Sequence, residues 1–191
     1  RAATSAPGLD VSVLDGVIAV DPVARTADVQ GMCTYEDLVD ETLPHGLMPY
    51  VVPQLRTITL GGAVTGLGIE STSFRNGLPH ESVLEMDVFT GSGEVVTCRP
   101  GPDGEHADLF DAFRNSYGSL RYATRLRIRL EPVPGYVALR HVRFDDLGLL
   151  AKSIAEIAET ASYDGERVDA VDGVAFEPGE YYLSLARWSD E

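Results

Sequence analysis

Apolar and polar residues alternate along several segments that end at glycine, proline or acidic residues. A period of two predicts strands, here over 17–21, 26–33, 48–52, 82–90, 94–98 and 123–130. Two segments have helical signals instead. Thr34 with Asp37 three residues later is typical of a helix N-cap, and Leu109, Phe110 and Phe113 share one face of a helix over 107–114. This part of the chain is therefore predicted to be α+β.

The pattern changes after a segment rich in proline. Residues 131–135 contain two prolines and a glycine, which resist both helix and central strand and therefore predict a domain boundary. Beyond it we expect a strand over 136–144, a helix capped by Asp145 or Asp146, and strands over 168–176 and 181–188. One helix on three strands has little core of its own, so we interpret 1–134 as a first domain and 135–191 as the beginning of a second.

Composition and charge exclude several classes of protein. The 191 residues carry a formal net charge of −15, which argues against nucleic-acid binding. No apolar run approaches the roughly 20 residues of a membrane span, and no stretch is typical of a signal peptide, so we expect a cytoplasmic protein. The two cysteines, Cys33 and Cys98, lack the spacing of metal ligands, and no metal site is predicted.

Arg125, Arg127 and Arg129 alternate with apolar residues in the predicted strand 123–130. They could form an anion-binding stripe, or a solvated strand face that pairs with some of the thirty acidic residues. We favour the solvated face, because unlike charges on neighbouring strands commonly pair in this way.

Residues 57–77 are the most unusual segment of the chain, because they contain five glycines together with several threonines and serines. Bare backbone N–H groups at a helix start bind anions such as a diphosphate, and the nearby Arg56 and Arg75 add positive charge. The segment matches neither a P-loop nor a dinucleotide fingerprint. Composition alone leaves two interpretations open: a cofactor-binding loop, or a turn of small residues packed against a helix.

Residues Thr59 to Gly66 resemble the T-x-G-G-x-x-x-G signature of FAD-binding domains of the vanillyl-alcohol oxidase/p-cresol methylhydroxylase (PCMH) type. The longer run from Leu60 to Leu78, which includes Gly68-Ile69-Glu70-Ser71, is similar to the delta-24-sterol reductase (Diminuto-like) branch. Asp108-Leu109-Phe110 and Gly118-Ser119-Leu120 match later stretches of that branch in the same order. The chain departs from the branch at Phe74, where the branch has a histidine, and near Asn115 and Arg121, where the branch has a tryptophan and a glycine.

The resemblance implies a fold and a set of cofactor contacts. The chain would hold the second subdomain of a PCMH-type FAD-binding domain, a mixed or antiparallel sheet with flanking helices, whose N-terminal subdomain would lie before Arg1. The start of an α+β substrate domain would follow. The diphosphate and isoalloxazine of FAD would lie against backbone at Pro53, Thr57, Thr59, Gly61, Gly62 and Gly66, the pyrimidine side and ribityl chain against Ile69, Glu70, Ser71 and Ser73, and the adenine or isoalloxazine region against the backbone of Tyr122.

The resemblance also implies a reaction. FAD, reduced by a nicotinamide donor such as NADPH, would deliver hydride to a carbon–carbon double bond of a sterol-like, lipophilic small molecule. The candidate proton donors are Glu70, Tyr117 and His80. Two alternatives stay open: a flavin oxidase or dehydrogenase acting on an alcohol or sugar, and a non-catalytic fragment that binds a partner protein.

Overall fold

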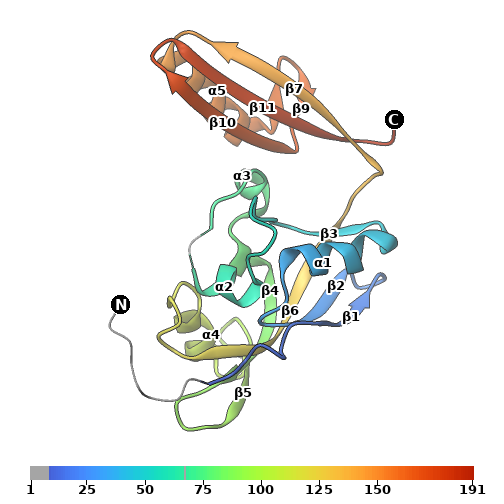
Figure 1. Cartoon of the computed structure of the whole chain (residues 1–191), viewed down its shortest axis with the longest axis vertical. Coiled ribbons are helices and arrows are strands. Elements are labelled where there is room, and N and C mark those ends of the chain that lie inside the picture. Colours follow the sequence, from blue (N-terminus) through green and yellow to red (C-terminus); the bar gives the residue numbers. More distant parts are fainter. Residues whose placement is uncertain (1–8, 67) are drawn as a thin grey trace.

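The computed structural model describes residues 9–66 and 68–191. The first eight residues of the predicted first domain, and Leu67 within the run that resembles the sterol reductases, lie outside the described residues. Figure 1 shows two modules that follow one another along the chain, each built on its own sheet. We call residues 9–132 the N-terminal module and residues 136–189 the C-terminal module.

The N-terminal module is built on an antiparallel sheet with the strand order β1-β2-β6-β4-β5. Its strands are β1 (Val17–Asp21), β2 (Thr26–Gln30), β4 (Val83–Phe89), β5 (Val95–Cys98) and β6 (Tyr122–Pro132). The short strand β3 (Leu47–Pro49) pairs with the far end of β6. Because β6 pairs with three strands, it is the central strand of the module.

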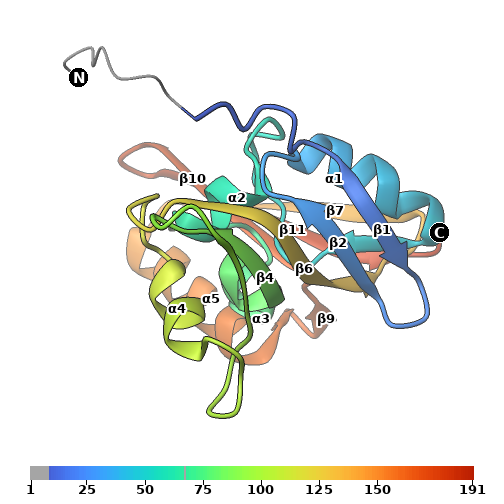
Figure 2. The same ribbon diagram turned by 90° about the horizontal axis from the view of Figure 1, so that it is seen from below.

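Three helices bury the apolar face of this sheet: α1 (Tyr35–Thr42), α2 (Leu60–Thr65) and α4 (Ala107–Phe113). Their side chains share one core with alternate residues of the sheet, including the fully buried Tyr35, Phe110 and Leu126. Figure 2 shows α1 near the β1 edge of the sheet and α4 near its β4–β5 edge. The short helix α3 (Ser73–Asn76) and the 3₁₀ turns η1 (Leu43–His45) and η2 (Pro79–Ser82) complete the module.

The opposite face of the sheet carries a charged ladder, which we define as Asp28, Glu85, Asp87, Arg125 and Arg127. Arg125 lies at its centre and pairs with Asp28 at 2.6 Å, with Asp87 at 2.7 Å and with Glu85, while Arg127 pairs with Asp28. The predicted pairing of this strand face with acidic residues is therefore confirmed for two of its three arginines.

The arginines keep the ladder carboxylates ionised. The hydrogen bond from Arg125 holds the pKa of Asp87 below its usual range. Burial acts to raise the pKa of Asp28 and Glu85, but hydrogen bonds from the arginines outweigh it and leave both pKa values lowered.

The C-terminal module is a three-stranded antiparallel sheet with one helix packed on it. The sheet order is β10-β11-β7, with β7 at Tyr136–Phe144, β10 at Ala170–Glu177 and β11 at Glu180–Ser189. The helix α5 (Leu147–Thr160) begins at its N-cap Asp146, which accepts a hydrogen bond from the Leu149 amide. A small hairpin of β8 (Ser162–Tyr163) and β9 (Glu166–Arg167), absent from the prediction, joins α5 to β10.

The predicted α+β fold is confirmed, with differences that have physical causes. Strand 26–33 ends at Gln30, because Gly31 turns the backbone toward α2. Strand 48–52 is observed only over Leu47–Pro49, because proline has no N–H to continue a ladder. Within the described ranges, no helix is long and apolar enough to cross a membrane, and no three His, Cys, Asp or Glu side chains form a metal-binding group.

Replacing Arg125 with glutamine tests the charged ladder. Arg125→Gln leaves three neighbouring carboxylates without their shared cation, so we expect a loss of about 2 kcal/mol of unfolding free energy near neutral pH. Because the pKa values of these carboxyls are lowered in the folded state, the stabilisation exists above their unfolded-state pKa and disappears as the pH falls through the folded-state pKa. The difference between variant and wild type in urea denaturation should therefore shrink in acid.

The matched control is Arg129→Gln, which removes an exposed arginine from the same strand. A loss in Arg125→Gln that is independent of pH, or equal to the loss in the control, would contradict the electrostatic origin of the effect.

Candidate functional site

The helix α2 begins where the glycine-rich segment meets the end of β2. Thr59 is its N-cap and accepts a hydrogen bond from the Gly62 amide at 3.2 Å. The Leu60 amide donates to the Cys33 carbonyl, and the Gly61 amide donates to the Gly31 carbonyl. The N–H groups expected to be bare for an anion are therefore hydrogen-bonded within the chain.

Two glycines at this contact are required by packing. A Cβ on Gly61 would lie 2.6 Å from the Gly31 carbonyl oxygen, and a Cβ on Gly31 would lie 2.0 Å from the Ala123 carbonyl oxygen. Either distance is shorter than a real Cβ contact, so only glycine permits this approach of α2 to the sheet. The packed-turn interpretation is therefore correct for these positions, and a cavity remains beside them.

We call this space the glycine cavity. It has a volume of about 120 Å³ and opens between the N-terminal segment, the end of β2, α2 and the start of β6. Its lining consists mostly of small or apolar residues with a single charged one: Val11, Leu14, Gly31, Met32, Gly61, Gly62, Thr65, Gly118, Arg121, Tyr122 and Ala123. Because four of these are glycines, a ligand in the cavity would lie against bare backbone.

The loop between α4 and β6 closes one side of the glycine cavity and is strained. Asn115, Tyr117 and Arg121 have φ values of 56°, 52° and 84°, a region that favours glycine. The Tyr117 amide donates to the Thr65 carbonyl at 2.7 Å and so fastens the loop to α2. Asn115 Oδ1 and Ser116 Oγ are buried without a hydrogen-bond partner among the described residues.

A second, larger space lies between the two modules, and we call it the intermodule cavity. It has a volume of about 380 Å³, within the range of small-molecule sites. Apolar and acidic side chains from both modules line it: Gln54, Ile69, Glu70, Ser71, Ile154, Val171, Asp172, Gly173 and Leu183. The glycine-rich segment thus borders both cavities, through α2 in one and through Ile69–Ser71 in the other.

Glu70 is, with Asp172, one of the two carboxylates that line the intermodule cavity. Its amide donates to Ser73 Oγ at 3.0 Å, which fixes the backbone, and its side chain accepts a weak hydrogen bond from the Gln54 amide at 3.4 Å. Burial raises the pKa of Glu70, and the negative charge of Asp172 raises it further, against the hydrogen bond from Gln54. A carboxyl with a raised pKa can exchange a proton more readily near neutral pH.

The two modules are joined by contacts beside this cavity. Arg75 donates from Nε to the Asp169 carbonyl at 2.8 Å and pairs with Glu131 at the end of β6. The Val171 amide of β10 donates to the Ser71 carbonyl at 2.9 Å. Gln54 Nε2 donates to Asp172 Oδ2 at 2.8 Å. Three of the residues in these contacts, Gln54, Ser71 and Asp172, also line the cavity.

The predicted cofactor contacts separate into three groups. Gly61, Gly62 and Tyr122 line the glycine cavity, and Ile69, Glu70 and Ser71 line the intermodule cavity. The remaining five residues line neither cavity: Pro53, Thr57, Thr59, Gly66 and Ser73. Two of them support the site indirectly, because Thr59 caps α2 and Ser73 accepts a hydrogen bond from the Glu70 amide.

The other two candidate proton donors lie apart from Glu70, since neither lines the intermodule cavity. Tyr117 is 75% exposed. His80 lies in η2, and its buried Nδ1 has no partner among the described residues. Burial lowers the pKa of His80, and the nearby Arg114 lowers it further, against Glu81.

Sequence reasoning missed several lining residues. Gln54, Ile154 and Asp172 come from three separate segments, and only the packing of the modules brings them together. For Arg121 the sequence did give an indication, because this residue stands near a position where the sterol-reductase branch has a glycine. Its φ of 84° is consistent with that difference.

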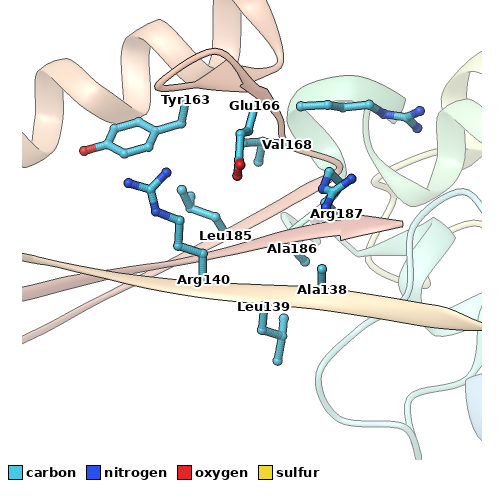
Figure 3. Close-up of a pocket in the computed structure, with 10 residues that line it drawn as sticks. Ala138, Leu139, Arg140, Tyr163, Glu166, Val168, Leu185, Ala186 and Arg187 are labelled. Atoms are coloured by element: carbon cyan, nitrogen blue, oxygen red, sulfur yellow. The ribbon is translucent and has the colours of Figure 1, made fainter. Parts of the chain in front are cut away.

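A third cavity, of about 140 Å³, lies within the C-terminal module, beneath the β8–β9 hairpin. Figure 3 shows Arg140 reaching toward Tyr163 and Glu166 pointing into the space, while Leu139 points to the other side of β7. Arg140 already pairs with Asp164 and stacks at 5.2 Å from the Tyr163 ring centroid. Its charge is therefore engaged, and the cavity lies away from the glycine-rich segment.

Comparison with known proteins assigns the family. The model of the FAD binding domain family matches residues 2–99, just over half of the chain. The chain is 35% identical to cytokinin dehydrogenase 2 of Oryza sativa subsp. japonica over 81% of its length, and 34% identical to cytokinin dehydrogenase 5 of Arabidopsis thaliana over 70%. It spans about a quarter of the length of each of these relatives.

The chain thus consists of two α+β modules with a glycine-rich segment at their boundary. It belongs to the FAD binding domain family, of the PCMH type that Thr59–Gly66 predicts. The comparisons show the family and do not show the sterol-reductase branch. Four glycines at the glycine cavity leave its backbone uncovered by side chains, which would let FAD lie against it.

Gly61→Ala tests the requirement for glycine at the α2 contact. The added methyl would meet the Gly31 carbonyl, so we expect a loss of about 2 kcal/mol or more of stability even without cofactor. Thermal unfolding of the cofactor-free chain measures this. Gly135→Ala is the control, since a Cβ there meets nothing within 4 Å. Equal melting temperatures for both variants would mean that α2 does not depend on this approach.

Proposed function

We propose that this chain forms the FAD-binding wall, and part of the substrate-binding wall, of a flavin-dependent oxidoreductase. The observation that carries the proposal is that one glycine-rich segment borders two cavities, one lined by bare backbone and one lined by apolar and acidic side chains of both modules. The first suits the cofactor and the second suits a substrate. When bound, FAD would supply hydride exchange with a carbon atom of that substrate.

The lining of the intermodule cavity supports a small, largely apolar substrate with one polar group. Ile69, Ile154 and Leu183 would contact its apolar part. Glu70 would face its polar group, with Gln54 and Ser73 holding Glu70 in place. A hydride transfer to or from carbon needs a matching proton transfer, and Glu70 would accept or donate that proton.

We propose dehydrogenation of the substrate as the first candidate reaction, because the relatives at 31–37% identity are named cytokinin dehydrogenases. In this direction Glu70 would act as the base that takes a proton from the polar group of the substrate, a cytokinin or a compound of similar size. An alcohol or sugar substrate would need the same residue in the same role.

The second candidate is reduction of a carbon–carbon double bond in a sterol-like, lipophilic substrate, with NADPH as the electron donor. The run Gly68-Ile69-Glu70-Ser71, with its resemblance to sterol reductases, favours it. Here Glu70 would donate the proton to the second carbon, and its raised pKa supports that role.

Flavin absorbance under anaerobic conditions separates the two candidates. Bleaching of the flavin band by a cytokinin supports dehydrogenation. Bleaching by NADPH, with recovery on addition of an unsaturated sterol, supports reduction. A colourless chain that takes up no added FAD would contradict both, and would favour a non-catalytic role in binding a partner.

Glu70→Gln tests the proton-transfer role. We expect turnover to fall about 100-fold or more while flavin absorbance is unchanged, because the side chain keeps its size but loses its proton exchange. Asp172→Asn should move the limb of the pH–rate profile that reports the ionisation of Glu70 to lower pH, since the charge of Asp172 raises the pKa of Glu70. Glu166→Gln, an exposed carboxylate of the C-terminal module, is the control. Normal turnover in Glu70→Gln would exclude this role.

A further inference from the structure

Each side chain of the four-residue helix α3 makes a contact outside the helix. Two contacts lie within the N-terminal module: Ser73 Oγ accepts from the Glu70 amide at 3.0 Å, and Asn76 Nδ2 donates to Glu131 Oε1 at 3.1 Å. The other two reach the C-terminal module, and Figure 1 shows α3 at the end of the N-terminal module that faces the C-terminal sheet. Because a single helical turn has no stability of its own, these contacts hold α3 in place.

Phe74 makes the apolar contact with the C-terminal module. It packs against a core whose buried residues include Ile157 of α5 and Leu183 of β11. Among the described residues of that core, Phe74 is the one that comes from the N-terminal module. One helix on three strands has little core of its own, so an aromatic ring from outside adds a large share of the apolar contact.

Arg75 makes the polar contact beside Phe74. Its Nε donates to the Asp169 carbonyl at 2.8 Å, just before β10, and its guanidinium pairs with Glu131 at 3.2 Å. The two side chains of this pair are only 20% and 15% exposed. Removing one partner of such a pair leaves a largely buried charge uncompensated. Arg75 thus holds both the start of β10 and the end of β6.

The chain just before α3 carries Glu70 into the intermodule cavity. Ser73 fixes the Glu70 amide, and the carbonyl of the next residue, Ser71, accepts from the Val171 amide of β10 at 2.9 Å. The same cavity is lined by Asp172, which follows Val171. The position of Glu70 relative to β10 therefore depends on how α3 meets the C-terminal module.

We propose that α3 couples the docking of the C-terminal module to the position of Glu70, with Phe74 and Arg75 as positioning residues. The C-terminal module docks on these two side chains, and Ser73 fixes the Glu70 backbone to the same helix. The intermodule cavity closes around Glu70 only in the docked arrangement. The proton-transfer role of Glu70 rests on the proposed function, whereas the coupling is a property of the cofactor-free chain.

Hydrogen exchange of the full, cofactor-free chain tests the docking. Phe74→Ala removes the ring from the C-terminal core, so the Val171 amide, which bonds across the modules, should exchange about tenfold faster or more. The amides of β11, which pairs with a strand on each side, should keep their rates within about twofold. Phe74→Leu should restore most of the protection of Val171. Equal acceleration at Val171 and in β11 would mean that Phe74 only supports the core, and would overturn the proposal.

A ¹³C NMR titration of the Glu70 carboxyl tests the coupling. Burial and the charge of Asp172 raise the pKa of Glu70. Tyr35 of α1, the other titratable group near Glu70 among the described residues, is neutral in this range and belongs to the N-terminal module. Undocking in Phe74→Ala removes part of the burial and moves Asp172 away, so the pKa of Glu70 should fall toward that of an exposed carboxyl. Phe74→Leu should keep it raised.

Phe144→Ala is the matched control, because Phe144 packs in the same core but comes from β7 of the C-terminal module itself. It should accelerate exchange in β11 and leave the pKa of Glu70 raised. A Glu70 pKa that is unchanged in Phe74→Ala, or that falls equally in Phe144→Ala, overturns the coupling. Neither result decides the proposed function, which the turnover of Glu70→Gln tests separately.

Discussion

The close approach of two backbones, at Gly31 and Gly61, is the constraint on which the rest of the site depends. It allows the first turn of α2 to hydrogen-bond with the end of β2, where any side chain would separate them. With α2 held there, its last turn binds the strained loop through the Tyr117 amide. The same helix then directs the chain toward the C-terminal module. One steric requirement thus fixes α2 on the sheet and, through the loop, one side of the glycine cavity.

Most of the fold could be predicted from local patterns, because periodicity and capping act over a few residues. Strands 17–21 and 136–144 are observed with the predicted bounds, and Thr34 caps α1 as its spacing with Asp37 indicated. The helices α2 and α3 could not be predicted in this way. Each is so short that tertiary contacts decide its conformation, and its glycine or polar residues have no helical periodicity.

The candidate site was predictable only where a motif carried it. The run from Thr59 to Gly66 indicated a cofactor-binding segment, although its amides turn out to be used internally. Asp172 and Ile154 had no signal, because they reach the intermodule cavity only through the packing of α5 and β10 against Ile69–Ser71. Contacts of this range depend on the whole fold, and a single sequence does not encode them in any local pattern.

Among the described residues, the hydrogen bonds between the two modules reach one short stretch, Asp169–Asp172, at the beginning of β10. Asp169 is itself fully buried and accepts from Arg167 and from the Trp188 amide, so the stretch is firmly anchored in its own module. Phe74 of α3 also packs against the apolar core of the C-terminal module, so an apolar contact supplements these hydrogen bonds. The boundary between the modules is therefore held by polar and apolar contacts together, and a substitution within Asp169–Asp172 would weaken only part of it.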